Sequence, residues 1–146
     1  MRATALLDTC AVLAILNRQD RWHHACMDSF SQLHKPLLTS EAVLAELFYM
    51  VGDNASRVEA AGKFVRSGAI TLALISDSDL PAIYRLMQQY RDCPMDFADA
   101  TLVHLAKRES LSTVLTIDFA DFQTYRIEGT KRFRILPDPK SRPGAH

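Results

Sequence analysis

The sequence predicts a single α/β domain built on a mostly parallel sheet. Short apolar runs alternate along the chain with longer segments in which apolar residues recur at helical spacing. This alternation is typical of strands joined by helices, the pattern of a layered α/β fold. The length of 146 residues fits one domain with a substantial core. We expect the domain to span residues 1–136 and residues 137–146, which include three prolines, to form a flexible tail.

Strands are predicted where short apolar runs are bounded by capping or turn-forming residues. They are residues 4–7, 36–39, 69–75, 113–117 and 133–136, of which the last is the weakest pattern. The first strand stops at Asp8 and the fourth stops at Asp118. Because ligands of parallel sheets bind beyond the carboxyl ends of the strands, both acids fall where a site is expected.

Helices are predicted from apolar residues three and four positions apart and from capping residues at their starts. They are residues 9–17, 21–33, 41–51, 55–66, 76–90 and 96–107. Thr9 and Ser40 are placed to cap the first and third helices, and Gly52 breaks the third. Pro81 falls in the first turn of the fifth helix, where proline is tolerated.

The overall charge is neutral, with 17 Lys plus Arg and 17 Asp plus Glu, so bulk charge does not indicate a nucleic-acid partner. Basic residues nevertheless gather near the end of the chain. They are Arg126, Lys131, Arg132, Arg134, Lys140 and Arg142, against Glu128 and Asp138. A solvated face and a contact with RNA explain this local patch equally well.

The cysteines and the apolar segments indicate a cytoplasmic protein. Cys10, Cys26 and Cys93 are an odd and unpatterned set, which argues against a disulfide framework and fits a reducing compartment. Asp8 and Thr9 interrupt the apolar start of the chain, so it does not have the pattern of a signal peptide. No segment is long and apolar enough to span a bilayer, and we expect no membrane partner.

Several carboxylates are expected to meet at the carboxyl edge of the sheet. Asp8 and Asp118 end strands, while Asp96 and Asp99 are three residues apart and share one face of a helix. By helical phase Asp99 lies at the edge of the apolar stripe, and Asp96 lies further toward solvent. Acids held together repel one another unless a cation offsets their charge. Oxygen ligands suit Mg²⁺ or Mn²⁺ rather than zinc, and such an ion can activate water toward a phosphoryl group.

Four segments, in order, resemble the motifs of PIN domains. They are Leu6-Leu7-Asp8-Thr9, residues 39–47 with Glu46 at the acidic position, residues 96–106 with Asp99, and residues 115–122 with Asp118 followed three positions later by Asp121-Phe122. The resemblance implies a three-layer α/β/α fold with a parallel sheet of four or five strands. It also implies cleavage of single-stranded RNA with Mg²⁺ or Mn²⁺. Small PIN proteins of this kind are VapC-like toxins, so the resemblance further implies an antitoxin protein as partner and a homodimer.

The resemblance also assigns roles to the acids and their neighbours. Asp8 and Asp99 are expected to bind the ion directly, and Glu46 and Asp118 to complete its shell directly or through water. These four are the expected catalytic and metal-binding residues. The groups expected to orient or assist them are Thr9, Thr116 and Asp96. Glu41 is a further acid whose part in the site stays open.

Other classes of protein fit the sequence less well. A haloacid-dehalogenase phosphatase needs a second Asp where Cys10 stands, and a response-regulator receiver needs an acidic pair that we do not find. His23, His24 and Cys26 lack the second ligand pair of a zinc site. Two alternatives stay open, a PIN-like module that binds RNA or protein without cutting and a housekeeping RNA-processing nuclease.

Overall fold

The computed structural model describes residues 2–141, and its centre is a parallel sheet of five strands. The strands are β1 (Leu6–Leu7), β2 (Leu37–Ser40), β3 (Ile70–Ala73), β4 (Thr113–Leu115) and β5 (Arg134–Leu136). Their order across the sheet is β3-β2-β1-β4-β5, and every pairing is parallel. The predicted fold class is confirmed, with five strands rather than four.

The helices follow the predicted order, with one addition. They are α1 (Thr9–Leu16), α2 (His23–Gln32), α3 (Glu41–Val51), α4 (Ala55–Val65), α5 (Leu80–Gln89), α6 (Phe97–Arg108) and α7 (Phe119–Thr124). The predicted helix over 76–90 starts as a short 3₁₀ turn, η1 (Asp77–Asp79), in which Ser76 and Asp79 form a capping box. Helix α7 was not predicted, because six residues are too few to show a helical period.

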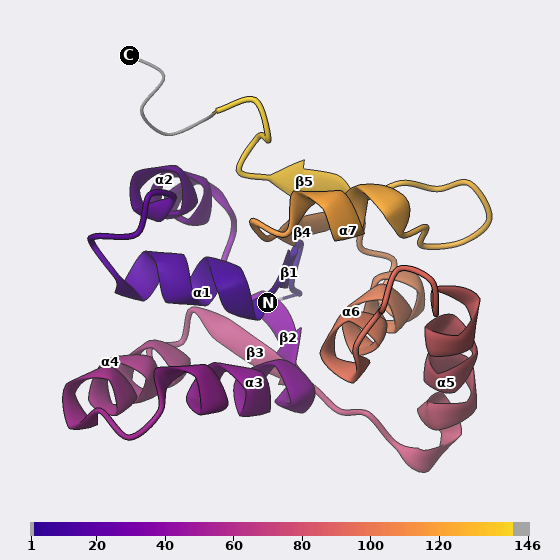
Figure 1. The fold of residues 1–146 in the computed structure, drawn as a ribbon, viewed down its shortest axis with the longest axis horizontal. Coiled ribbons are helices and arrows are strands. Elements are labelled where there is room, and N and C mark those ends of the chain that lie inside the picture. The colour runs from indigo at the N-terminus through magenta and orange to yellow at the C-terminus, as the bar shows by residue number, and fades with distance from the viewer. Residues whose placement is uncertain (1, 142–146) are drawn as a thin grey trace.

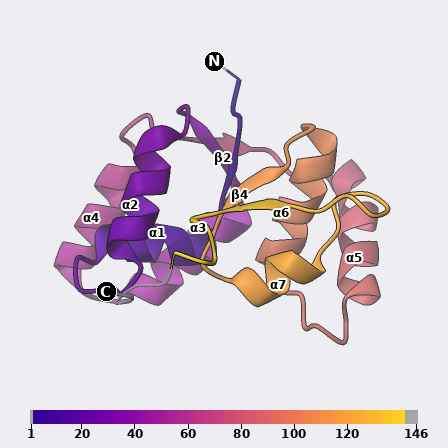
Figure 2. The same cartoon turned by 90° about the horizontal axis from the view of Figure 1, so that it is seen from above.

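Helices cover both faces of the sheet, which gives the predicted three layers. Figure 2 shows α1, α2 and α4 on one side of the strands and α5 and α6 on the other. Successive strand residues point to opposite faces, so Leu6 joins the core under α5 and α6, whereas Leu7 joins the core under α1 and α4. Helix α3 serves both cores, through Val43 on one side and Leu47 on the other.

Helix α6 is buried almost all round. The buried residues are Ala98, Asp99, Ala100, Thr101, Leu102, Val103, Leu105 and Ala106. The one-sided apolar stripe predicted for this helix is too narrow, because α6 packs against β2, α3 and α5 together. The consequence for function is that Asp99 lies in a nearly water-free environment.

The chain end is described only in part. Residues 137–141 form a turn in which the Ser141 amide donates to the Asp138 carbonyl oxygen at 2.9 Å. Residues 142–146 lie outside the described residues, so the flexible tail stays a prediction. Within residues 2–141, none of the helices has the length and apolar character needed to cross a membrane.

Candidate active site

The predicted acids come from four different elements that meet near the carboxyl edge of the sheet. Asp8 follows β1 and caps α1, and Asp118 lies between β4 and α7. Asp99 is in the first turn of α6, and Glu46 is in the middle of α3. Because Leu7 is paired with Leu115, the residue after each, Asp8 and Thr116, are neighbours across the sheet.

Asp8 is buried and accepts hydrogen bonds on both of its carboxylate oxygens. Its Oδ1 accepts from the Thr9 amide at 2.8 Å, and its Oδ2 accepts from Thr116 Oγ1 at 2.8 Å. Burial nevertheless raises the pKa of Asp8, because few water molecules can solvate its charge. Thr116 Oγ1 also accepts from the Asp118 amide at 3.0 Å, so one hydroxyl links the two acids. The Thr9 hydroxyl donates instead to the Val43 carbonyl oxygen at 3.3 Å, which ties α1 to α3.

The Cys10 thiol belongs to the same network, although the sequence analysis gave it no part in the site. Its Sγ donates to Asp8 Oδ2 at 3.4 Å, accepts from the Ile117 amide at 3.3 Å and lies 3.2 Å from Thr116 Oγ1. Burial raises the pKa of the Cys10 thiol, so it stays protonated. The thiol is therefore a hydrogen-bonding group beside Asp8. No pattern in the sequence indicated this role.

Asp99 is a buried acid whose pKa is strongly raised. It is 8% exposed, and burial, followed by the charges of Asp8 and Asp96, raises its pKa to about 8. Tyr125 donates its hydroxyl to Asp99 Oδ2 at 2.9 Å, and the Asp99 amide donates to Asp96 Oδ1 at 2.8 Å. Burial also raises the pKa of the Tyr125 phenol, which therefore remains a donor. Nothing in the sequence pattern had pointed to Tyr125.

Asp99, Asp118 and Asp121 form the tightest group of acids among the described residues. Each offers a carboxylate oxygen, and the three oxygens lie within 4.8 Å of one another. Burial, then the proximity of Asp121, raises the pKa of Asp118 to about 6. Asp121 was not among the predicted site residues. It reaches Asp118 because the two are one turn apart on α7, the helix that the sequence analysis missed.

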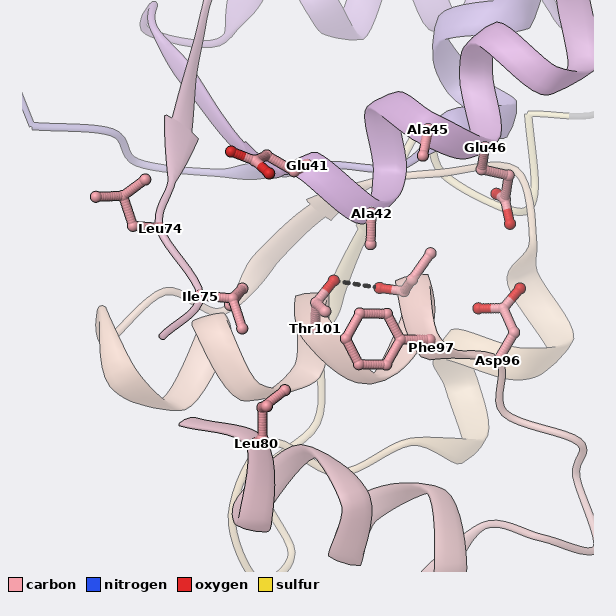
Figure 3. A pocket seen from close by; sticks show the side chains of 11 residues that line it. Glu41, Ala42, Ala45, Glu46, Leu74, Ile75, Leu80, Asp96, Phe97 and Thr101 are labelled. Carbon is pink, nitrogen blue, oxygen red and sulfur yellow. Dashed lines mark hydrogen bonds between the residues drawn. The ribbon is translucent and has the colours of Figure 1, made fainter. Parts of the chain in front are cut away.

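Glu46 and Asp96 lie on the other side of the site. Asp96 is exposed and caps α6, and Glu46 is half-buried. Their side chains point toward one another in Figure 3. Burial raises the pKa of Glu46, and the charges of Asp96 and Asp8 add to the rise. Asp8 therefore raises the pKa of each of the other three predicted acids, but Glu46 is not in the group of three.

A groove of about 710 Å³ opens beside Glu46 and Asp96. It lies between α3, the start of α6 and the segment that links β3 to α5 (Figure 3). Its remaining lining is mainly apolar and comprises Ala42, Ala45, Leu74, Ile75, Leu80, Phe97, Ala98 and Thr101, with Glu41 at the far end. The groove is therefore acidic where it meets the site and apolar beyond it.

The donor set fits a hard divalent cation. Carboxylate oxygens dominate it, and the one nearby sulfur is a protonated thiol. None of the salt bridges formed within residues 2–141 involves Asp8, Glu46, Asp99 or Asp118. The mutual repulsion of these acids is thus not offset by an ion pair, and a bound cation would offset it.

Comparisons with known proteins agree with this geometry. Ribonuclease VapC26 of Mycobacterium tuberculosis (strain ATCC 25618 / H37Rv) is 31% identical over 135 residues, which cover 90% of this chain and 99% of the relative. Among solved structures, VapC20 of M. tuberculosis, a toxin that cleaves the sarcin–ricin loop, matches with a TM-score of 0.70 and 16% identity over 81% of this chain and 94% of that one.

Two further solved structures share the fold. VapBC2 from Rickettsia felis, bound to a promoter DNA fragment, gives a TM-score of 0.64 with 15% identity over 91% of this chain and 98% of that one. A toxin–antitoxin complex from Klebsiella pneumoniae gives a TM-score of 0.63 with 19% identity over 85% of this chain and 94% of that one. The family model of the PIN domain matches residues 5–127, most of the chain. On this evidence the chain belongs to the PIN domain family.

Proposed function

We propose that this protein is a Mg²⁺- or Mn²⁺-dependent endoribonuclease that cleaves single-stranded RNA and serves as the toxin of a toxin–antitoxin pair. The observation that carries the proposal is the close group of Asp99, Asp118 and Asp121 beside the buried Asp8. Its support is the ribonuclease relative, which aligns along 90% of the chain. A non-catalytic PIN-like module and a housekeeping nuclease are the alternatives that the experiments below separate.

In the proposed reaction the acids of the site divide into two roles. Asp99, Asp118 and Asp121 would hold the ion, and Asp8 would contribute from the position that Thr116, Thr9 and Cys10 fix. When bound, a divalent ion lowers the pKa of a coordinated water and stabilises negative charge on a phosphoryl group.

Glu46 lines the groove and would take a proton from the attacking water. Water then adds to phosphorus as a ribose oxygen leaves from the opposite side, and the proton passes to that oxygen. Glu46, whose pKa burial raises, can hold that proton in transit.

The nuclease activity is tested with the purified full-length protein and a labelled RNA, single-stranded or annealed to its complement. Cleavage of the single strand should require Mg²⁺ or Mn²⁺ and stop with EDTA. Asp8→Asn, purified identically, should be inactive yet folded, because asparagine also caps helices well. RNA binding without cleavage would indicate the non-catalytic module, and equal activity in EDTA or in Asp8→Asn would rule out the proposed mechanism.

We propose that the antitoxin occupies the groove beside Glu46 and Asp96. Its apolar wall suits aliphatic or aromatic side chains, and its acidic end suits one Arg or Lys that reaches toward the site. The support for such a partner is that solved structures of this fold include a toxin–antitoxin complex. The antitoxin should therefore inhibit cleavage. The variant Ala45→Trp, in which the new side chain fills the groove, should be inhibited less than the wild type, while its cleavage rate without antitoxin should equal that of the wild type.

The role as a toxin is tested in cells. Expression of the wild type alone should arrest growth, Asp8→Asn should not, and co-expression of a small neighbouring gene should relieve the arrest. Active enzyme without any growth effect would indicate housekeeping RNA processing instead. We further propose that the protein acts in the cytoplasm as a homodimer, which light scattering of the purified chain would test.

A further inference from the structure

A second, smaller cleft lies on the other side of α6 from the groove. It encloses about 300 Å³ between α5, α6 and the turn that follows α7. In both Figure 1 and Figure 2 the chain after α7 reaches over α6 toward α5. Three cations from these three segments line the cleft, namely Arg85, Lys107 and Arg126, and the one acid in its lining is Glu128.

Arg126 is held in place with one edge of its guanidinium free. Its Nη1 donates to the carbonyl oxygens of Gln123 at 2.7 Å, Thr124 at 2.9 Å and Tyr125 at 3.1 Å, at the end of α7. Its Nε and Nη2 have no hydrogen-bond partner among residues 2–141. These two nitrogens form the edge of the guanidinium that matches two oxygens of a phosphate. The side chain is therefore ordered in advance for binding an anion.

The other charges leave the cleft with an excess of cations. Lys107 Nζ lies 3.7 Å from Glu128 Oε1, but both side chains are largely exposed, at 59% and 69%, so this ion pair is weak and easily exchanged. Arg85 is exposed and forms no ion pair within the described part of the chain. His104 also lines the cleft, but its Nε2 is engaged with Asp79 Oδ1 at 2.8 Å.

The cleft is close to the acids of the active site. Arg126 directly follows Tyr125, whose hydroxyl contacts Asp99. Lys107 is eight residues beyond Asp99 on α6, about 12 Å along the helix axis. A nucleic-acid strand whose scissile phosphate lies at Asp99 would therefore reach the cleft with a phosphate about two nucleotides further along.

We propose that this cleft binds a backbone phosphate of the RNA strand away from the cleaved bond. The proposal rests on the proposed function, since it takes RNA as the substrate. A fixed guanidinium edge with two further cations recognises phosphate and no particular base, so the site should contribute affinity without sequence preference. The proposal also gives a function to one member of the basic patch near the chain end, because Arg126 lines this cleft.

The test measures RNA binding rather than cleavage. Full-length protein with Asp8→Asn, in EDTA, is titrated with two single-stranded RNAs of unrelated sequence at several salt concentrations. Adding Arg85→Gln or Arg126→Gln should weaken binding about tenfold for both RNAs. Each should also lower the slope of log affinity against log salt by about 0.7. Arg57→Gln, an exposed α4 position with the same charge change, is the control and should change neither.

The variants are chosen so that misfolding is recognised. Arg126→Gln removes bonds at the end of α7, so its thermal melting is compared with the parent, and Arg85→Gln, which breaks no hydrogen bond among residues 2–141, gives an independent reading. Arg126→Lys should keep the salt slope but recover only part of the affinity, because lysine lacks the guanidinium edge.

The outcomes separate this proposal from the proposed function. Unchanged binding in Arg85→Gln and Arg126→Gln, or an equal loss in Arg57→Gln, overturns the phosphate cleft even if the wild type cuts RNA. An acidic protein segment that binds the cleft while RNA affinity stays unchanged also overturns it. If the two substitutions weaken RNA binding but the wild type with metal cuts no RNA, the phosphate cleft is supported and the proposed nuclease function is refuted.

Discussion

Replacing Asp99 by asparagine should make the metal-free protein more stable, and increasingly so as the pH rises. Asp99 has a pKa of 3.8 in an unfolded chain and about 8 in the fold, because burial and neighbouring acids disfavour its charge. Between these values the folded state holds a proton that the unfolded state has released. Stability is therefore lost as the pH rises from 3.8 to about 8 and is constant above that. Asparagine cannot ionise, and its side-chain oxygen can still accept a hydrogen bond from the Tyr125 hydroxyl.

The magnitude follows from the linkage between protons and folding. Each pH unit in this range costs the wild type about 1.4 kcal/mol relative to Asp99→Asn. From pH 5 to pH 8 the difference should grow by at most about 4 kcal/mol, or roughly 10 °C in melting temperature for a chain of this size. The control is Asp53→Asn, an exposed turn position, which should melt like the wild type at every pH.

The assay is thermal melting of both proteins in EDTA across this pH range, repeated with Mn²⁺. Metal at a hundred times its dissociation constant should narrow the difference at pH 8, because the ion binds the wild type and stabilises it by about 2.7 kcal/mol. A pH-independent difference between the two proteins in EDTA would refute the high pKa of Asp99. An equal gain from Mn²⁺ in both proteins would refute its role as a metal ligand.

Three further substitutions test the groups around the acids. Tyr125→Phe removes the hydroxyl that donates a hydrogen bond to Asp99. We expect the apparent affinity for Mn²⁺ to fall about tenfold in calorimetric titration, while the melting curve stays cooperative. Asp96→Ala should slow cleavage distinctly less than Asp99→Ala at every Mn²⁺ concentration, because Asp96 is exposed and Asp99 is buried; the reverse ranking would make Asp96 the ligand. The cleavage rate of Cys10→Ser should stay within about threefold of the wild type, whereas that of Cys10→Ala should fall about tenfold, because only serine can replace the hydrogen bond to Asp8. Equal cleavage rates in the two variants would show that the thiol does not position Asp8.

The sequence by itself determined the layered fold and the edge of the sheet at which the acids gather. Apolar runs and helical periods are local patterns, so they place strands and helices correctly to within a few residues. Asp8 and Asp118 were found because each follows a strand, and parallel strands end at one edge. The ranking of Asp99 above Asp96 in burial also came from helical phase alone, and the structure confirms it.

The tertiary structure alone decided which side chains touch. Tyr125 reaches Asp99 from 26 residues away, and Cys10 meets Thr116 from 106 residues away, contacts that depend on strand order and helix packing rather than on any local pattern. Asp121 and Asp118 are three residues apart, but only the packing of α7 brings this pair to Asp99, which lies on another helix. Local periodicity fixes the elements, whereas the physical chemistry of a site depends on long-range packing, which sets the distances and the exclusion of water.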